Sequence, residues 1–131
     1  MKKKKQTIGG WVEVFVDAVL QYGEFIFKDS RIANKHYARF IEALKQLNRF
    51  GDDGLSALAC LLDDGRLAVR TTAACYLVKY RTDSALGVLR EAAKAKDRAI
   101  SMLAVATLRR WEMGYYLDPA TGEEARCRQQ K

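Results

Sequence analysis

The stretch that decides the fold runs from Leu55 to Leu77 and reads LSALACLLDDGRLAVRTTAACYL. Its first half places leucines at helical spacing and stops at the acidic turn 63–65. Its second half begins near position 67 and puts apolar residues on one face of a helix. The turn is only about three residues long, so we expect two antiparallel helices packed against each other. Alanines and a cysteine in the second helix would allow the two axes to approach closely.

Helical spacing continues on the N-terminal side of this hairpin. An apolar face predicts a helix over about 11–28, which Gly23 is expected to end or bend. A second helix is predicted over about 30–49, with Asp29–Ser30 as its N-terminal cap. The sequence at 50–53 then offers a glycine to end that helix and aspartates to cap the next one.

The same spacing continues on the C-terminal side. The pattern predicts one helix over about 83–95 and another that begins at a capping Asp97 and ends at Gly114. Of the residues that follow, Tyr115, Tyr116 or Leu117 is expected to pack on the domain. We therefore expect an all-α fold of about six helices in three antiparallel hairpins of about 30 to 40 residues, as in a short helical repeat. A plain six-helix bundle is the alternative.

The net charge of +7 belongs to the two ends of the chain. Of the 23 basic residues, seven lie at positions 2–5, 126, 128 and 131, so 16 remain against 16 acidic residues in between. The stretch 6–125 is therefore formally neutral. We expect a basic tail at 1–8, a helical domain over 9–117 and a loose tail at 118–131.

The sequence favours a cytoplasmic protein. Glu13 and Asp17 interrupt the apolar stretch after the lysine run, which excludes a secretion signal, and no run of about 18 apolar residues could span a membrane. The cysteines are odd in number and widely spaced, as in proteins of a reducing compartment. We expect Cys60 and Cys75 to be small buried apolar groups and Cys127 to be an exposed thiol.

Catalytic and metal-binding patterns are missing from the sequence. His36 is the only histidine, and its place in a helix favours a solvent-facing or turn-capping role. The cysteines lack zinc-ligand spacing, and the acidic pairs 52–53 and 63–64 lie at helix junctions, where they suit caps and the helix dipole. Gly9–Gly10 lacks the strand and the lysine of a phosphate loop. We expect no enzyme activity, no metal and no cofactor.

The strongest candidates for partner binding are charged residues on the second helix of each hairpin, because these helices line the concave face of a solenoid. The candidates are Arg39, Glu42, Arg49, Arg70, Lys79, Arg109 and Glu112. The pair Arg109–Arg110 beside Trp111 mixes charge with an aromatic ring, as binding hot spots do. The alternative, weighed equally, is that Trp111 belongs to the core and the arginines are solvated.

Several motifs resemble HEAT-type repeats. An acidic turn residue followed six positions later by an arginine joins successive turns in that family, and Asp64 and Arg70 occupy the matching places. From Trp11 to Tyr116 the chain resembles a small bacterial HEAT-like family of unknown function, similar to immunity proteins of polymorphic toxin systems. The residues that carry this resemblance are Asn34, Tyr37, the L-x(5)-LL-x-D block ending at Asp64, Val69–Arg70, Ala73–Ala74, Ala85, Leu89, Leu108, Trp111 and Gly114.

The resemblance implies a protein that binds and blocks a cognate toxin without performing chemistry. Binding to a nucleic-acid backbone through a basic concave face is the alternative, and the neutral domain argues against it. Nucleic acid is expected to bind only weakly, through the basic tails, and no membrane contact is expected. The oligomeric state is left open.

Overall fold

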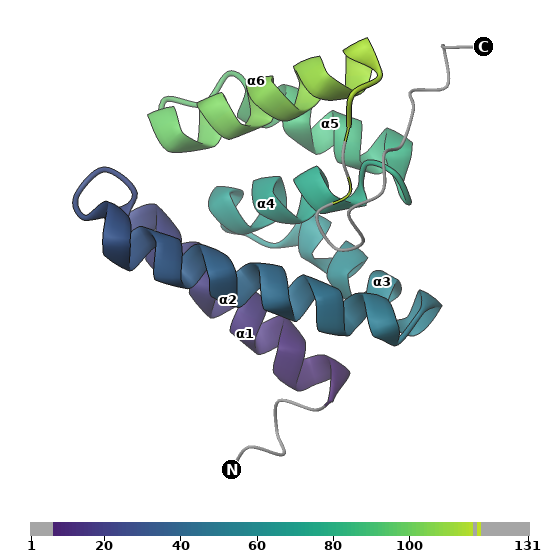
Figure 1. Cartoon of the computed structure of the whole chain (residues 1–131). Helices are drawn as coiled ribbons and strands as arrows, with labels where there is room; N and C mark the ends of the chain where they lie inside the picture. The colour runs from purple at the N-terminus through teal and green to yellow at the C-terminus, as the bar shows by residue number, and fades with distance from the viewer. Residues whose placement is uncertain (1–6, 117, 119–131) are drawn as a thin grey trace.

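The computed structural model describes residues 7–116 and 118, and this part of the chain is helical, with no β-strand (Figure 1). The predicted all-α class is therefore confirmed. The predictions for Leu117, Cys127 and most of both tails lie outside the described residues. The elements are α1 (Ile8–Phe25), α2 (Ser30–Arg49), α3 (Asp52–Ala59), the 3-10 helix η2 (Cys60–Asp63), α4 (Leu67–Leu77), α5 (Thr82–Ala92) and α6 (Arg98–Met113).

The helix boundaries follow local capping chemistry. The Asp29 carboxylate accepts hydrogen bonds from the first backbone amides of α2, and the Asp97 carboxylate accepts one from the Ile100 amide at the start of α6. Gly114 ends α6 with a positive φ of 79°. These three predictions are confirmed.

Gly23 lies inside α1, which ends two residues later at Phe25. A single glycine weakens a helix without breaking it when neighbouring helices support it. One boundary prediction is wrong. The expected aspartate cap of α3 is replaced by Gly51, while Asp52 and Asp53 lie in the first helical turn. There their negative charges face the positive end of the helix dipole.

The leucine-rich helix of the central hairpin tightens at its end into η2. The tighter winding brings Leu61 and Leu62 together into the core, whereas Cys60 is exposed. The prediction that Cys60 is buried is therefore wrong, because it assumed an uninterrupted α-helical face. The corresponding prediction for Cys75 is confirmed.

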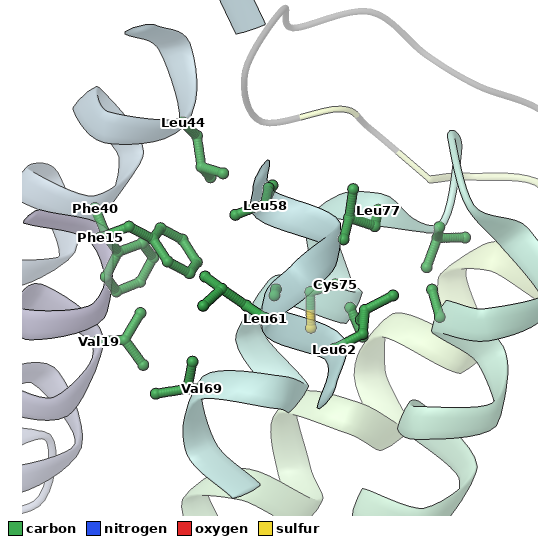
Figure 2. Close-up of a cluster of buried hydrophobic side chains, with 14 of the residues drawn as sticks. Phe15, Val19, Phe40, Leu44, Leu58, Leu61, Leu62, Val69, Cys75 and Leu77 are labelled. Atoms are coloured by element: carbon green, nitrogen blue, oxygen red, sulfur yellow. The ribbon is translucent and has the colours of Figure 1, made fainter. Parts of the chain in front are cut away.

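One apolar core joins all six helices. Figure 2 shows the part of it that is formed by α1 to α4. Phe15 of α1 meets Phe40 of α2 edge to face, with ring centroids 5.9 Å apart, and also meets Tyr76 of α4. Leucines of α3 and η2 fill the space between these rings and the C-terminal half of the molecule. The core therefore connects the long N-terminal pair to the rest of the fold.

Helix α4 lies at the centre of the molecule. It contacts α1, α3, α5 and α6, and Figure 1 shows it between α2 and α6. Residues 71–75 and 77–78 are all buried, so this helix has almost no solvent-facing side along its second half. Its alanines and threonines make this crowding possible, because small side chains let neighbouring helices approach from several directions.

The segment after α6 returns to α4. The Tyr116 hydroxyl donates a hydrogen bond of 2.7 Å to the Cys75 carbonyl oxygen, and its ring packs on Trp111. The buried Asp118 carboxylate accepts a hydrogen bond from the Tyr80 hydroxyl. The prediction that one residue of 115–117 packs on the domain is confirmed for Tyr116, while Tyr115 is exposed.

Candidate partner-binding groove

A groove of about 560 Å³ lies across α2, α4 and α6, and we call it the α2–α4–α6 groove. These are the second helices of the three predicted hairpins. The lining residues are Tyr37 and Ile41 of α2, Cys75 and Tyr76 of α4, Leu103, Thr107 and Arg110 of α6, and Tyr116. Each of these three helices therefore contributes side chains to the groove, but none of the seven predicted site residues is among its lining residues.

Helical spacing explains which residues line the two walls. Tyr37 and Ile41 are four residues apart, so they lie one above the other on α2. Leu103, Thr107 and Arg110 follow the same rule on α6, at intervals of four and three residues. Each wall is therefore a straight strip of side chains. Helix α4, which Figure 1 shows between α2 and α6, contributes Cys75 and Tyr76 to the lining.

The groove combines aromatic surface with one positive charge. Tyr37 is exposed on the α2 wall, where its ring also packs on Phe40 at a centroid distance of 5.1 Å. Arg110 has no ion-pair partner among the residues that the structure describes, so its guanidinium remains available for an external carboxylate. Tyrosine and arginine are the residue types that carry most binding energy at protein interfaces.

Burial keeps three titratable side chains of the groove, Cys75, Tyr76 and Tyr116, in their neutral form at neutral pH. Burial raises the pKa of the Cys75 thiol to about 11, and burial also raises the pKa values of Tyr76 and Tyr116. The Thr107 hydroxyl, which lies 3.2 Å from the Cys75 sulfur, is 2.9 Å from the Leu103 carbonyl oxygen in its own helix. At neutral pH these groups can pack or donate hydrogen bonds, but they supply neither a thiolate nor a general base.

The predicted site residues of α2 lie away from this groove. Arg39 points toward α1, and its guanidinium donates a hydrogen bond of 2.9 Å to the Asp17 carboxylate of that helix. It also donates to His36, one turn earlier in α2. Glu42 and Arg49 line a shallow polar depression on α2 itself. Glu42 and Arg49 both hydrogen-bond Gln46, so this surface is occupied by contacts within one helix.

The predicted residues Arg70, in α4, and Lys79, just after it, take part in internal contacts. The Arg70 guanidinium donates to the Asp64 carbonyl oxygen at 2.9 Å and to the Glu91 carboxylate of α5 at 3.3 Å. The bridge that the resemblance implies therefore uses the Asp64 backbone, while the Asp64 carboxylate pairs with Arg66. Lys79 lies 3.5 Å from the Asp118 carboxylate.

On α6, the predicted residues Arg109 and Glu112 are exposed, and neither lines the groove. Trp111 is buried, as the core interpretation of this residue predicted. The neighbouring Arg110 is the arginine of this pair that reaches the groove.

Sequence reasoning missed the groove tyrosines because Tyr37 and Tyr76 fit the apolar stripes of their helices. The signal that could have found them is chemical: tyrosine at a stripe position indicates an apolar ring whose hydroxyl reaches water or a partner. Tyr116 offered no such signal, because no helical period extends beyond Gly114.

The His36 side chain is held by contacts with its neighbours in the fold. Its ring stacks on Phe25, with centroids 6.3 Å apart, and its Nδ1 atom lies 2.9 Å from an Arg39 nitrogen. Within the described residues, no three histidine, cysteine or acidic side chains are grouped as a metal site would need. No described helix combines the length and apolar character needed to cross a bilayer.

Comparison of the chain with protein-family models, with curated proteins and with solved structures found no match.

Proposed function

We propose that this chain is a non-catalytic protein-binding module that holds its partner in the α2–α4–α6 groove. The observation that carries this proposal is the composition of the groove, in which an exposed tyrosine and an unpaired arginine lie beside apolar side chains. The neutral state of Cys75, Tyr76 and Tyr116 supports binding rather than reaction.

The best-supported partner is a cognate bacterial toxin, which the chain would block by occlusion as an immunity protein in the cytoplasm. The motifs at 55–64 and 69–74 that resemble a HEAT-like family favour this function. A short HEAT-like repeat arrangement is part of the same proposal, and its support is the joint contribution of α2, α4 and α6 to one groove. The free thiols of Cys60 and Cys75 agree with a reducing compartment.

The groove favours a partner that inserts an apolar or aromatic side chain next to a carboxylate. The side chain would pack between the Tyr37 and Leu103 walls, and the carboxylate would pair with the Arg110 guanidinium. A backbone or side-chain acceptor on the partner would accept a hydrogen bond from the hydroxyl of the exposed Tyr37. An acidic loop or helix end carrying one large apolar residue has this chemistry.

Nucleic-acid binding by the folded domain is less well supported, because its basic side chains are often neutralised locally. Arg39 pairs with Asp17, Arg66 with Asp64, and Arg70 with Glu91. Cations already paired with carboxylates release few counterions when a phosphate approaches, so they contribute little to affinity for nucleic acid.

Co-expression with the protein encoded by the neighbouring gene tests the proposal. We expect a one-to-one complex in size-exclusion chromatography and protection of cells that produce the partner. Tyr37→Glu and Arg110→Glu should each weaken the complex at least tenfold, because they place negative charge where the groove presents a ring or a cation. His36→Ala should leave affinity unchanged.

Arg49→Glu is the matched control for Arg110→Glu, because it makes the same charge change on α2 outside the groove. The proposal fails if Arg49→Glu weakens the complex as much as Arg110→Glu does. It also fails if the neighbouring protein neither co-purifies with the folded chain nor loses its toxicity. Far-ultraviolet circular dichroism confirms folding of each variant.

A further inference from the structure

Helix α6 exposes an apolar face outside the α2–α4–α6 groove. Met102, Val105 and Met113 on α6 and the following Tyr115 have exposed fractions between 40% and 63%. These four are half of the large apolar side chains that are exposed in the described part of the chain. On an ordinary protein surface, exposed apolar side chains are scattered singly. A group of them on one helix is typical of an interaction site.

This surface, which we call the outer face of α6, has the shape of a helix-binding site. Its residues line a depression of about 560 Å³ and are Ser101, Met102, Val105, Ala106, Arg109, Arg110, Met113 and Tyr115. Positions 102 to 113 span about three helical turns, or roughly 17 Å, in one straight strip. The small side chains of Ser101 and Ala106 leave the hollow between the larger ones, where a side chain from another helix fits.

The charges around the outer face of α6 are mainly positive. The helix carries Arg98, Arg109 and Arg110 against a single acidic residue, Glu112. Arg98 lies over the Phe27 ring at 5.5 Å, whereas Arg109 and Arg110 have no ion-pair partner among the described residues. Two unpaired arginines beside an apolar strip favour a partner with carboxylates along its own apolar strip.

We propose that the outer face of α6 binds an amphipathic α-helix of a partner protein whose apolar stripe is bordered by aspartate or glutamate. A second copy of this chain fits less well, because an α6-to-α6 contact would bring two basic rims together. The chain's own residues 119–131 offer only alanine and cysteine as apolar side chains beyond the proline, too small to fill the hollow. This surface is distinct from the groove, although Arg110 lines both.

A pair of synthetic peptides tests this proposal with the full chain. Both are helix-stapled, fluorescein-labelled peptides of about 16 residues with the same leucine stripe, bordered by glutamates in one and by lysines in the other. Fluorescence anisotropy should show at least tenfold tighter binding of the glutamate peptide. Met102→Glu should weaken that binding at least tenfold, and Arg109→Glu should abolish the preference for glutamate over lysine.

Lys45→Glu is the matched control, because it makes the same kind of charge change on an exposed position of α2. It should leave peptide affinity within about twofold. The proposal is overturned if neither peptide binds, if both bind equally, or if Met102→Glu leaves binding intact while the chain remains helical. It is also overturned if sedimentation velocity shows a dimer that Met102→Glu converts to monomer, or if removal of residues 119–131 raises peptide affinity.

Discussion

Arg70 and Arg66 show how differently two arginines four residues apart can contribute to one turn. The Arg70 side chain is only 20% exposed and joins the Asp64 carbonyl oxygen to Glu91 on the next hairpin. The Arg66 side chain is 53% exposed and forms an ion pair with the Asp64 carboxylate. Burial decides the energetic difference, because water competes with an exposed ion pair and much less with a covered hydrogen bond.

We expect Arg70→Ala to lower the free energy of unfolding by about 1 to 3 kcal/mol, because a covered carbonyl oxygen loses its charged donor. Arg66→Ala is the control and should cost about 0 to 1 kcal/mol, the usual value of an exposed ion pair. Urea titration followed by circular dichroism measures both. Equal effects would mean that the Arg70 side chain is hydrated in solution.

The same turn should make stability depend on acid pH. Hydrogen bonds from Arg66 lower the pKa of Asp64 from 3.8 to about 2. Because the pKa is lower in the folded state, ionised Asp64 stabilises the fold well above pH 3.8, and this stabilisation is lost as the pH falls from 3.8 toward 2. The free-energy difference between the wild type and Asp64→Asn should therefore be constant from pH 7 to 5 and shrink below about pH 4.

Urea titrations at a series of pH values measure this difference. A difference that stays constant down to pH 3 would contradict the lowered pKa. Arg66→Ala in the wild-type background should reduce the pH dependence, because it removes the main cause of the shift.

At the scale of elements, the packing of α3 against the end of α2 requires a glycine at position 54. A Cβ atom placed on Gly54 would lie 1.9 Å from the Leu47 carbonyl oxygen of α2. Such a distance is far inside van der Waals contact, so α3 can cross the end of α2 only because position 54 is glycine. Gly51, with a positive φ of 67°, makes the chain reversal that precedes this crossing.

We expect Gly54→Ala to destabilise the protein by at least about 1 to 3 kcal/mol, the usual cost of overpacking, because the clash involves backbone that cannot rotate away. Gly87→Ala in α5 is the matched control, since a Cβ there would meet nothing within 4 Å. It should stabilise the protein by about 0.5 to 1 kcal/mol through the higher helix propensity of alanine. Thermal or urea unfolding measures both, and a neutral Gly54→Ala would show that the two helices can separate.

The helices could be predicted from the sequence because their signals are local. Apolar spacing and the caps Asp29, Asp97 and Gly114 depend on residues within a few positions of each other. The tightening at Cys60 could not be predicted, because it is set by how Leu61 and Leu62 fit a core built from distant segments.

The residues that line the groove could not be predicted from the sequence, for a geometric reason. Periodicity indicates which residues share a face of a helix, but it does not indicate which neighbour that face meets. Arg39 and Tyr37 are two residues apart, so they lie on opposite sides of α2: Arg39 meets Asp17 of α1, and Tyr37 lines the groove. Tertiary contacts decide between these sides.

At the scale of the whole molecule, the six helices share one core rather than forming separate units. Trp111 of α6 is buried in this core together with Phe15 of α1. A shared core favours a single cooperative unfolding transition, whereas a repeat array with weak internal contacts can unfold in steps.

In a Trp11→Phe variant, Trp111 fluorescence reports on the C-terminal half of the fold, while circular dichroism at 222 nm reports on all helices. We expect the two urea transitions to coincide in midpoint and slope. Trp11 is half-buried, so this substitution should disturb the core little. A dichroism transition that begins at lower urea than the fluorescence transition would show that the N-terminal pair unfolds separately.

The burial of α4 on nearly all sides should affect how the sequence of this protein evolves. In α2 and α6, tolerated and destabilising substitutions should alternate with the helical period, because each of these helices has one side that faces solvent. Along 71–74 and 77–78, larger side chains should be rejected at every position, since these residues are buried among neighbouring helices. The enclosed part of α4 would then stay nearly fixed while the walls of the groove vary, so that new partners can be recognised without a change of the core.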